Sequence, residues 1–356
     1  MKITKIPGLG RFGVFIDDLD FKNLSHEEWM EIGRLHLNSL VTIIRNANIT
    51  PIEYTHWMAK WGTQRDLIYY RLEKKYNIFY SKLVPMVLAD DPSIDEEDKL
   101  FIRSALRMGL KDDKGANTTA LQVTGKRDEN GNPLGMFAEG ELLWHSNESG
   151  NLCFTPAVSL LANEGVIGSA TGFLTTTDWY EQQSEAFRSE LDEMILVHKF
   201  TPGKINPGLR QEQDFMMYKN MCPEDGSEIP MVITSPGGIR GLHYSINTVD
   251  YIKGMSREES QKIFDRINKE LFVEEFIYDH WYQNDNDLCL FDNSITLHRR
   301  LGGITNRMCY RIQYDYEDIL DQPYDPYSIE PYKTMYRDQI TDLVSTLNRK
   351  RYKLPA

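Results

Sequence analysis

The chain has 356 residues, of which 41% are hydrophobic, and its formal net charge at pH 7 is −13, with a pI near 5.2. This length and apolar fraction are enough to bury a large core, as one domain with insertions or as two small domains. The acidic balance argues against a general polyanion binder, because affinity for phosphate backbones comes from clustered Lys and Arg. We therefore expect a small-molecule substrate and no nucleic-acid partner.

The cysteine spacing and the hydropathy exclude further classes. Cys153, Cys222, Cys289 and Cys309 form no C-x-x-C pair, so we expect free thiols rather than a zinc ribbon or a thioredoxin-type motif. No apolar h-region follows Met1, and no apolar stretch approaches the roughly 20 residues that cross a bilayer. These features predict a cytoplasmic protein without a membrane partner.

Short apolar runs alternate with helix starts between residues 11 and 63. Phe12–Ile16 and Val41–Ile44 are predicted to be buried strands. Ser25 stands three residues before Glu28, the spacing of a capping box, and Pro51 opens a second helix. This part therefore predicts strand, helix, strand and helix in that order.

Helical periodicity dominates the next block and returns later in the chain. Residues 64–113 are predicted to be helical, as an insertion that serves as a lid or an oligomer contact. Thr176–Val197 is predicted to be one helix, because its large apolar residues share one face. Ser256 begins another amphipathic helix over Arg257–Leu271.

The last third adds strands at Leu288–Phe291, Ile295–His298 and Met308–Tyr314. Strands separated by long loops, with helices packed outside, favour a β-sandwich or barrel over a parallel α/β sheet. The absence of a glycine-rich dinucleotide fingerprint lowers the odds of a nicotinamide or flavin enzyme. We expect a mostly β fold with flanking helices, as a single domain over residues 1–356 with residues 316–356 as a C-terminal extension.

Two histidines and their neighbours carry the chemistry. His145 is followed by Asn147 and Glu148, and His298 lies far along the chain. On a strand, residue 147 shares a face with His145, whereas residue 148 needs a bend to join them. Imidazole and carboxylate ligands on one face of a metal suit Fe(II) that binds oxygen and a co-substrate.

Two arginines follow the second histidine on the next predicted strand. Arg307 and Arg311 are four positions apart and so lie on one face of that strand. A guanidinium is a forked, permanently charged donor that suits a buried carboxylate. Surface ion pairs are the alternative explanation for both arginines.

With these residues in place, the chain resembles the taurine/2-oxoglutarate dioxygenase family, whose members are iron enzymes with a double-stranded β-helix (jelly roll) core. The resemblance covers most of residues 11–63 and 141–315. The matching segments are Phe15–Asp18, Ile44–Pro51, Trp144–His145, the Thr171 region, Gly254–Ser260 and Phe291–His298.

The resemblance implies a role for each matching residue. His145 and His298 correspond to the iron-binding histidines, and Thr171 to the hydroxyl that binds the distal carboxylate of 2-oxoglutarate. Arg307 corresponds to the arginine that pairs with that carboxylate, and Arg311 to one that meets an anionic substrate group. The implied cofactors are Fe(II) and 2-oxoglutarate, which with O2 would hydroxylate a small polar or amino-acid-like substrate and release succinate and CO2.

One position departs from the family pattern. Asn147 stands where the family has a carboxylate, and a neutral amide is a weaker iron ligand. Three alternatives stay open: Glu148 bends in as the third ligand, Asn147 or water fills the position, or the site is inactive. Glu141 is a candidate to bracket a zwitterionic substrate together with Arg311, against the alternative that it is a solvated surface residue.

Two rival functions remain at the level of the sequence. The first is a metal-poor, inactive relative that acts as a 2-oxoglutarate- or ligand-binding module, favoured by Asn147. The second is a carbohydrate- or partner-binding jelly roll, in which His145, His298 and Arg307 would be spatially unrelated. Whether the chain forms a homo-oligomer is open.

Overall fold

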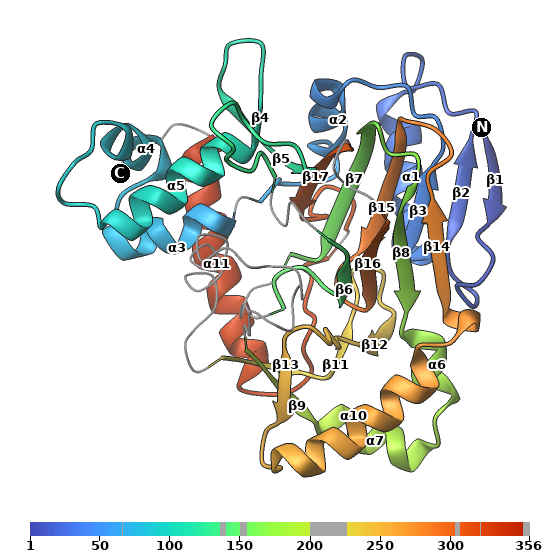
Figure 1. Ribbon diagram of the computed structural model, residues 1–356. Coiled ribbons are helices and arrows are strands. Elements are labelled where there is room, and N and C mark those ends of the chain that lie inside the picture. The colour runs from blue at the N-terminus through green and yellow to red at the C-terminus, as the bar shows by residue number, and fades with distance from the viewer. Residues whose placement is uncertain are drawn as a thin grey trace.

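Two β-sheets form the centre of the molecule (Figure 1). The computed structural model describes residues 1–65, 67–135, 140–149, 155–199, 226–302, 307–320 and 322–351. Within them, the larger sheet has the order β1 (Lys2–Lys5), β2 (Val14–Asp17), β3 (Val41–Ile44), β15 (Asp287–Asp292), β7 (Ala157–Glu164), β17 (Met308–Tyr314), β5 (Asn117–Thr124) and β4 (Gly109–Lys111). The smaller sheet has the order β14 (Ile277–Trp281), β8 (Ser169–Thr175), β16 (Thr296–Gly302) and β6 (Leu142–His145).

The two sheets share one apolar layer. Val158 and Leu160 of β7 and Phe291 of β15 belong to the same buried cluster as Phe173 of β8. The rings of Phe173 and Phe291 are 5.3 Å apart, which joins the smaller sheet to the larger one. Because alternate residues of a strand face opposite sides, the neighbours of these residues point away from the smaller sheet.

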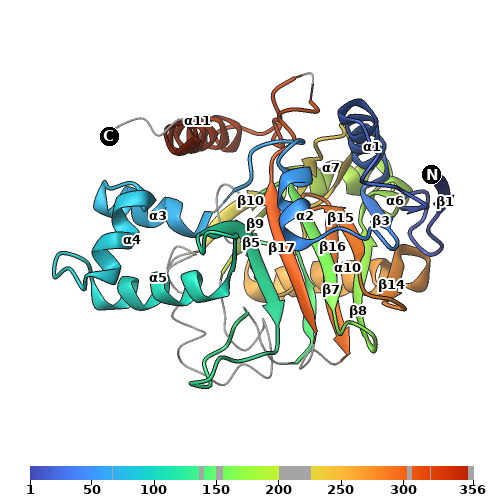
Figure 2. The ribbon, with the colours of Figure 1, turned by 90° about the horizontal axis from the view of Figure 1, so that it is seen from above.

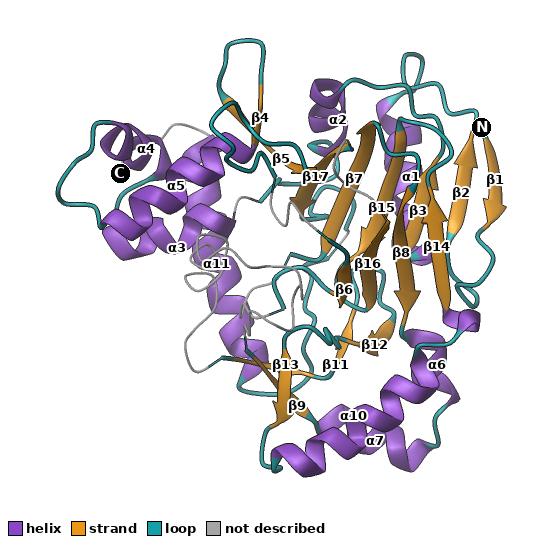
Figure 3. Cartoon of the chain, viewed as in Figure 1, coloured by secondary structure: helices purple, strands orange, loops and turns teal. Residues whose placement is uncertain are grey.

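The other face of the larger sheet is covered by α1 (His26–Ser39) and α2 (Pro51–Met58) (Figure 2). Leu161 of β7 and Ile312 of β17 lie in this second cluster with Trp29 of α1. Both helices begin with a capping box, on Ser25 with Glu28 and on Thr50 with Glu53. The predicted order of strands and helices in the N-terminal part is confirmed, and so is the mostly β fold with flanking helices (Figure 3).

The segment predicted as one helix over Thr176–Val197 is instead two helices and a strand. These are α6 (Thr177–Gln182), α7 (Glu185–Glu193) and β9 (Ile195–His198). The break has a local cause, since the Ser184 hydroxyl caps α7 by accepting a hydrogen bond from the Phe187 amide. Periodicity alone did not reveal this second start.

A group of short strands and one longer helix lies below the two sheets in the view of Figure 1. Strand β9 pairs with β10 (Ser227–Pro230) and β13 (Val249–Ile252), while β11 (Val232–Thr234) and β12 (Arg240–Leu242) form a hairpin. Helix α10 (Arg257–Leu271) begins with the predicted capping box at Ser256, and the turn η1 (Glu274–Phe276) leads into β14. This group shares a buried cluster with Leu174 and Leu297 of the smaller sheet.

The block predicted to be helical contains α3 (Leu67–Tyr76), α4 (Tyr80–Leu88) and α5 (Glu96–Met108) and stands to one side of the sheets (Figure 1). It has an apolar cluster of its own, which includes Leu83 and Ile102. The prediction is wrong at the end of the block, where Gly109–Lys111 form strand β4 because they pair with β5. Near the end of the chain, α11 (Tyr332–Arg351) follows β17.

The structure also bears on the state of the cysteines and on the hydropathy of the helices. Cys289 and Cys309 are buried free thiols, as expected, whereas Cys153 and Cys222 lie outside the described residues. Among the helices that the structure describes, none combines the length and the hydropathy that a membrane span requires.

Candidate active site

The two candidate metal-binding histidines lie side by side. His145 ends β6 and is the register partner of His298 on β16. Their ring centroids are 4.1 Å apart, and the Phe291 ring lies 4.7 Å from that of His298. Two imidazoles that are far apart in the sequence therefore face one cavity.

Both imidazoles are in the protonation state that a metal needs. The Nδ1 of His145 is 2.7 Å from the Leu143 carbonyl oxygen, so it donates to that oxygen and leaves Nε2 as the acceptor. Burial lowers the pKa of His145 to about 4 and that of His298 well below its ordinary value, assisted by the charge of Arg311. The buried Nδ1 of His298 has no hydrogen-bond partner within the described residues. Two neutral imidazoles are thus available at neutral pH.

The two candidates for the third ligand occupy different places. Asn147 is buried, with 7% of its surface exposed, and lines the same pocket as His145 and His298. Glu148 is half-buried and is not among the described residues that line this pocket. Its carboxylate accepts a hydrogen bond of 3.4 Å from the Thr155 hydroxyl.

Arg307 has the surroundings of an anion-binding residue. It is only 2% exposed, and Nη1 donates to the Ser169 hydroxyl at 3.2 Å. Within the described residues its Nε has no hydrogen-bond partner, and no carboxylate pairs with it. Thr171, on β8, lines the same pocket and shares a hydrogen bond of 2.7 Å with the Tyr282 hydroxyl.

The pocket between the two sheets is lined by basic and apolar side chains together, since Arg311 is the register partner of both Leu160 and Leu121. It is lined by Leu121, Gln122, Val123, Leu142, His145, Asn147, Leu160, Thr171, Phe291, His298, Arg299, Arg300, Arg307 and Arg311. The described lining therefore contains four arginines and neither Asp nor Glu, which favours an anionic ligand. Its cavity volume of about 70 Å³ exceeds the roughly 10–15 Å³ that one water needs.

Two of these arginines already have defined protein contacts. Arg299 forms a two-pronged ion pair with Asp279 and lies over the Trp144 ring. Arg300 donates from Nε and Nη2 to the Gly140 carbonyl. Arg311 is on β17 and lines the same pocket as Arg307.

The structure brings most of the candidate residues together. His145, His298, Asn147, Thr171, Arg307 and Arg311 share one pocket. Glu141 is exposed, accepts a hydrogen bond of 3.3 Å from the Gly302 amide and is not in the described lining. His243 and Tyr244 are buried and hydrogen-bonded to Ser294 and Asn268, and neither is in the described lining of the pocket.

Sequence analysis missed Arg300 and Asn293 as residues of the site or its support. Arg300 stands two positions after His298, and this period-two spacing on a strand was a usable signal. Asn293 is in the turn between β15 and β16, and nothing in its spacing to Asn147 indicated their contact.

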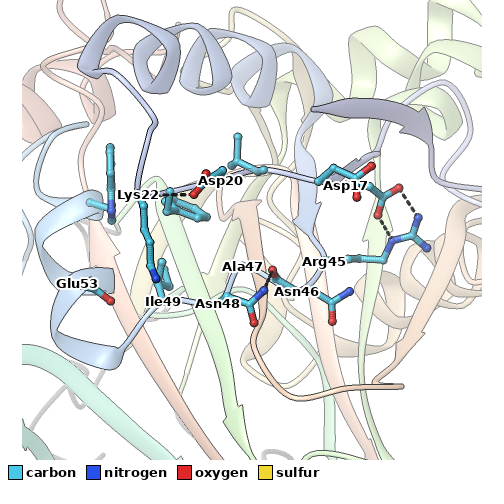
Figure 4. Close-up of a pocket in the computed structure, with 13 residues that line it drawn as sticks. Asp17, Asp20, Lys22, Arg45, Asn46, Ala47, Asn48, Ile49 and Glu53 are labelled. Atoms are coloured by element: carbon cyan, nitrogen blue, oxygen red, sulfur yellow. Dashed lines mark hydrogen bonds and ion pairs between the residues drawn. The ribbon is translucent and has the colours of Figure 1, made fainter.

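A second pocket, with a volume of about 400 Å³, is lined mainly by the segments that follow β2 and β3 (Figure 4). Several of its charged groups already have partners, since Arg45 pairs with Asp17, and Asp20 accepts from the Lys22 backbone amide and the Asn23 side chain. Its described lining has no histidine or cysteine. The pocket between the sheets is therefore the better candidate active site.

The pocket has enough donor side chains for a metal ion, but these donors carry no negative charge to offset the charge of the ion. Two imidazoles and the amide of Asn147 provide three protein donors, with the lone pairs of His145 aligned by Leu143. Within the described residues, however, no three His, Cys, Asp or Glu side chains are grouped to hold a metal. A divalent ion here would keep one positive charge that a carboxylate would otherwise offset.

The chain is similar to known proteins in sequence and in fold. The family described as "Taurine catabolism dioxygenase TauD, TfdA family" matches residues 3–313. A solved structure of AAD-2 in complex with Mn(II) and N-oxalylglycine is 17% identical, with a TM-score of 0.61, over 88% of this chain and 97% of that chain. A taurine dioxygenase from Burkholderia xenovorans is 16% identical, with a TM-score of 0.57, over 88% and 89% of the two chains. No curated protein matches the chain.

Proposed function

Because the chain belongs to the TauD/TfdA family of dioxygenases, we propose that it is an Fe(II)- and 2-oxoglutarate-dependent oxygenase. It hydroxylates a small polar or amino-acid-like substrate that carries an anionic group, and it releases succinate and CO2. In this proposal the two facing sheets form a double-stranded β-helix core. Residues 1–356 are one oxygenase domain, with residues 64–113 as a helical insertion and residues 316–356 as a C-terminal extension.

The observation that carries the proposal is the buried guanidinium of Arg307 in the same pocket as two neutral imidazoles. Removing a charged group from water costs several kcal/mol unless an opposite charge and hydrogen bonds compensate. Within the described residues, Arg307 has the Ser169 hydroxyl and no carboxylate. A dicarboxylate that reaches Arg307 at one end and a metal at the other supplies the missing charge.

Two pairs of residues in the pocket bind the metal and the co-substrate. His145 and His298 hold the metal, and the Leu143 carbonyl fixes the orientation of His145. Arg307 and the Thr171 hydroxyl hold the distal carboxylate of 2-oxoglutarate.

In this proposal three further residues of the pocket contact the substrate. Arg311 binds the anionic end of the substrate, and Leu160 and Phe291 keep the cavity apolar where carbon is oxidised. When bound, iron and 2-oxoglutarate supply the activation of O2 and the oxidation of a C–H bond. A role for Glu141 in binding an amino group stays a prediction.

Anaerobic addition of Fe(II) and 2-oxoglutarate to the metal-free protein tests the proposal. We expect the visible charge-transfer band of an iron-chelated keto acid, and succinate once O2 and substrate are supplied. His145→Ala should lose the band, while Arg45→Lys, in the pocket of Figure 4, should keep it. A wild-type protein that binds neither component would exclude this function.

A second function, a 2-oxoglutarate- or ligand-binding module without catalysis, is favoured by one observation. Asn147 stands in the pocket where a carboxylate ligand is expected, and the described residues contain no alternative group of three metal ligands. In that case 2-oxoglutarate binds to Arg307, but no succinate forms at any Fe(II) concentration. Assays of binding and of succinate on the same sample separate the two functions.

A further inference from the structure

The segment that carries Asn147 is clamped by one buried side chain. The Oδ1 of Asn293 accepts a hydrogen bond of 2.8 Å from the Asn147 amide, and its Nδ2 donates to the Asn147 carbonyl at 3.0 Å. The same Nδ2 donates to the Thr155 carbonyl at 2.8 Å. Asn293 is 0% exposed, so these contacts are shielded from water. Its amide thus fixes the backbone of Asn147 from both sides.

A second contact sets which atom of the Asn147 side chain faces the pocket. Gln313, on β17, donates from Nε2 to the Thr155 hydroxyl at 3.3 Å, which leaves its Oε1 as an acceptor. That Oε1 accepts a hydrogen bond of 3.4 Å from the Nδ2 of Asn147. Because Nδ2 is directed at Gln313, the Oδ1 of Asn147 is the atom left for the pocket.

The neighbouring carboxylate is turned away by the backbone. Glu148 has φ of +63°, in the left-handed region that a non-glycine residue enters only when its surroundings impose it. Its side chain accepts from the Thr155 hydroxyl and is outside the described lining of the pocket. To reach the histidines, Glu148 would have to reverse this turn and break the Asn293 clamp.

We propose that the amide oxygen of Asn147, and not the carboxylate of Glu148, is the third metal donor, and that divalent metal and keto acid therefore bind with strong mutual dependence. This inference rests on the proposed function and deepens it. Asn293 and Gln313 are positioning residues, because they act through Asn147.

The mutual dependence follows from charge. With two neutral imidazoles and a neutral amide, a divalent ion keeps its full charge in a pocket lined by arginines. A dianionic keto acid supplies the missing negative charge, so the metal should bind weakly without it and tightly with it. By linkage, the metal strengthens keto acid binding by the same factor.

Titration of the metal-free protein with Mn(II), followed by electron paramagnetic resonance with and without N-oxalylglycine, tests the inference without turnover. For the wild type we expect N-oxalylglycine to tighten Mn(II) binding by about tenfold or more. Asn147→Asp should tighten Mn(II) alone by about tenfold and reduce the effect of N-oxalylglycine to about threefold or less. Glu148→Gln should leave both Mn(II) affinities unchanged.

The positioning role needs its own variants. Gln313→Leu should weaken Mn(II) binding by about tenfold, because Asn147 loses the acceptor that orients its amide. Gln313→Glu keeps an acceptor at that place and also adds a negative charge, so it should bind Mn(II) at least as tightly as the wild type; a loss as large as that of Gln313→Leu would remove the positioning role. Circular dichroism checks that both variants are folded.

The outcomes separate this inference from the proposed function. Tight Mn(II) binding by the wild type without N-oxalylglycine, lost in Glu148→Gln, would make Glu148 the ligand and overturn the inference alone. If wild type and Asn147→Asp bind neither Mn(II) nor N-oxalylglycine, the proposed function fails as well.

Discussion

His145 and His298 lie directly opposite each other on β6 and β16, with ring centroids 4.1 Å apart. The register of this strand pair decides whether they meet. A slip of one residue would turn every side chain of β16 to the other face and carry His298 out of the pocket. The pairing of β16 with β8 on its other side, from Thr296 opposite Thr175 to Gly302 opposite Ser169, holds that register.

His298→Leu should make the metal-free protein more stable. The buried Nδ1 of His298 has no partner in the described part of the chain, and an apolar side chain removes that uncompensated polar group. We expect the free energy of unfolding in urea to rise by about 1 kcal/mol, while metal binding is lost.

His36→Leu is the matched control for this variant. His36 is also fully buried, but its two ring nitrogens contact the hydroxyls of Thr42 and Tyr316. We expect it to destabilise the protein by about 1–3 kcal/mol. Equal destabilisation by both variants would show that the His298 ring is satisfied in the folded protein.

Arg307→Lys should weaken 2-oxoglutarate binding while leaving metal affinity in its absence unchanged. Lysine keeps the positive charge but lacks the planar fork that binds a carboxylate with two hydrogen bonds. We expect a loss of affinity of at least about tenfold by isothermal titration calorimetry, compared with no change for Arg45→Lys. An unchanged affinity would mean that another arginine of the pocket, such as Arg311, holds the carboxylate.

Asn293→Ala should destabilise the protein and weaken metal binding together. The substitution leaves the Asn147 amide and two carbonyl groups without their buried partner. We expect a loss of about 2–3 kcal/mol in the free energy of unfolding, measured in urea. Asn130→Ala, in an exposed turn, should change stability by less than about 0.5 kcal/mol. If Asn293→Ala left stability and metal binding unchanged, Asn293 would not be the residue that holds Asn147 in place.

The wild type should lose stability relative to His36→Gln as the pH falls. Burial lowers the pKa of His36 from 6.5 to about 3 in the folded state. Below pH 6.5 the unfolded chain therefore takes up a proton at this position that the folded chain does not. The contribution is complete above pH 6.5 and is lost as the pH falls towards 3, by up to about 1.4 kcal/mol per pH unit.

Other buried groups act in the opposite direction, which is why the comparison with His36→Gln is needed. Burial raises the pKa of Asp292 to about 7 and that of Asp315 to about 6, so these two carboxyls favour the folded state at low pH. Their contributions cancel in the difference between the two proteins. Urea midpoints at pH 7, 6 and 5 give that difference, and a constant value would show that the pKa of His36 is the same in the folded and the unfolded chain.

Local patterns in the sequence determined several helix starts and five of the strands that the structure describes, β2, β3, β15, β16 and β17. Ser25 with Glu28 and Ser256 with Glu259 form the predicted capping boxes, because a cap depends on residues three positions apart. Met308–Tyr314 is a strand over the predicted range, because its apolar residues alternate. The break at Ser184 was missed because its capping contact outweighs the helical periodicity on both sides.

The sequence by itself also singled out His145, His298, Thr171, Arg307 and Arg311, since their types and order are a one-dimensional pattern, and the structure places all five in one pocket. Their chemical roles stay predictions. Only the tertiary structure decided which of Asn147 and Glu148 faces the histidines. That choice depends on the Asn293 and Gln313 side chains, which come from β15–β16 and β17 and reach Asn147 only after the strands have paired. Hydrogen bonds between residues so far apart in the chain leave no periodicity or spacing for sequence analysis to detect.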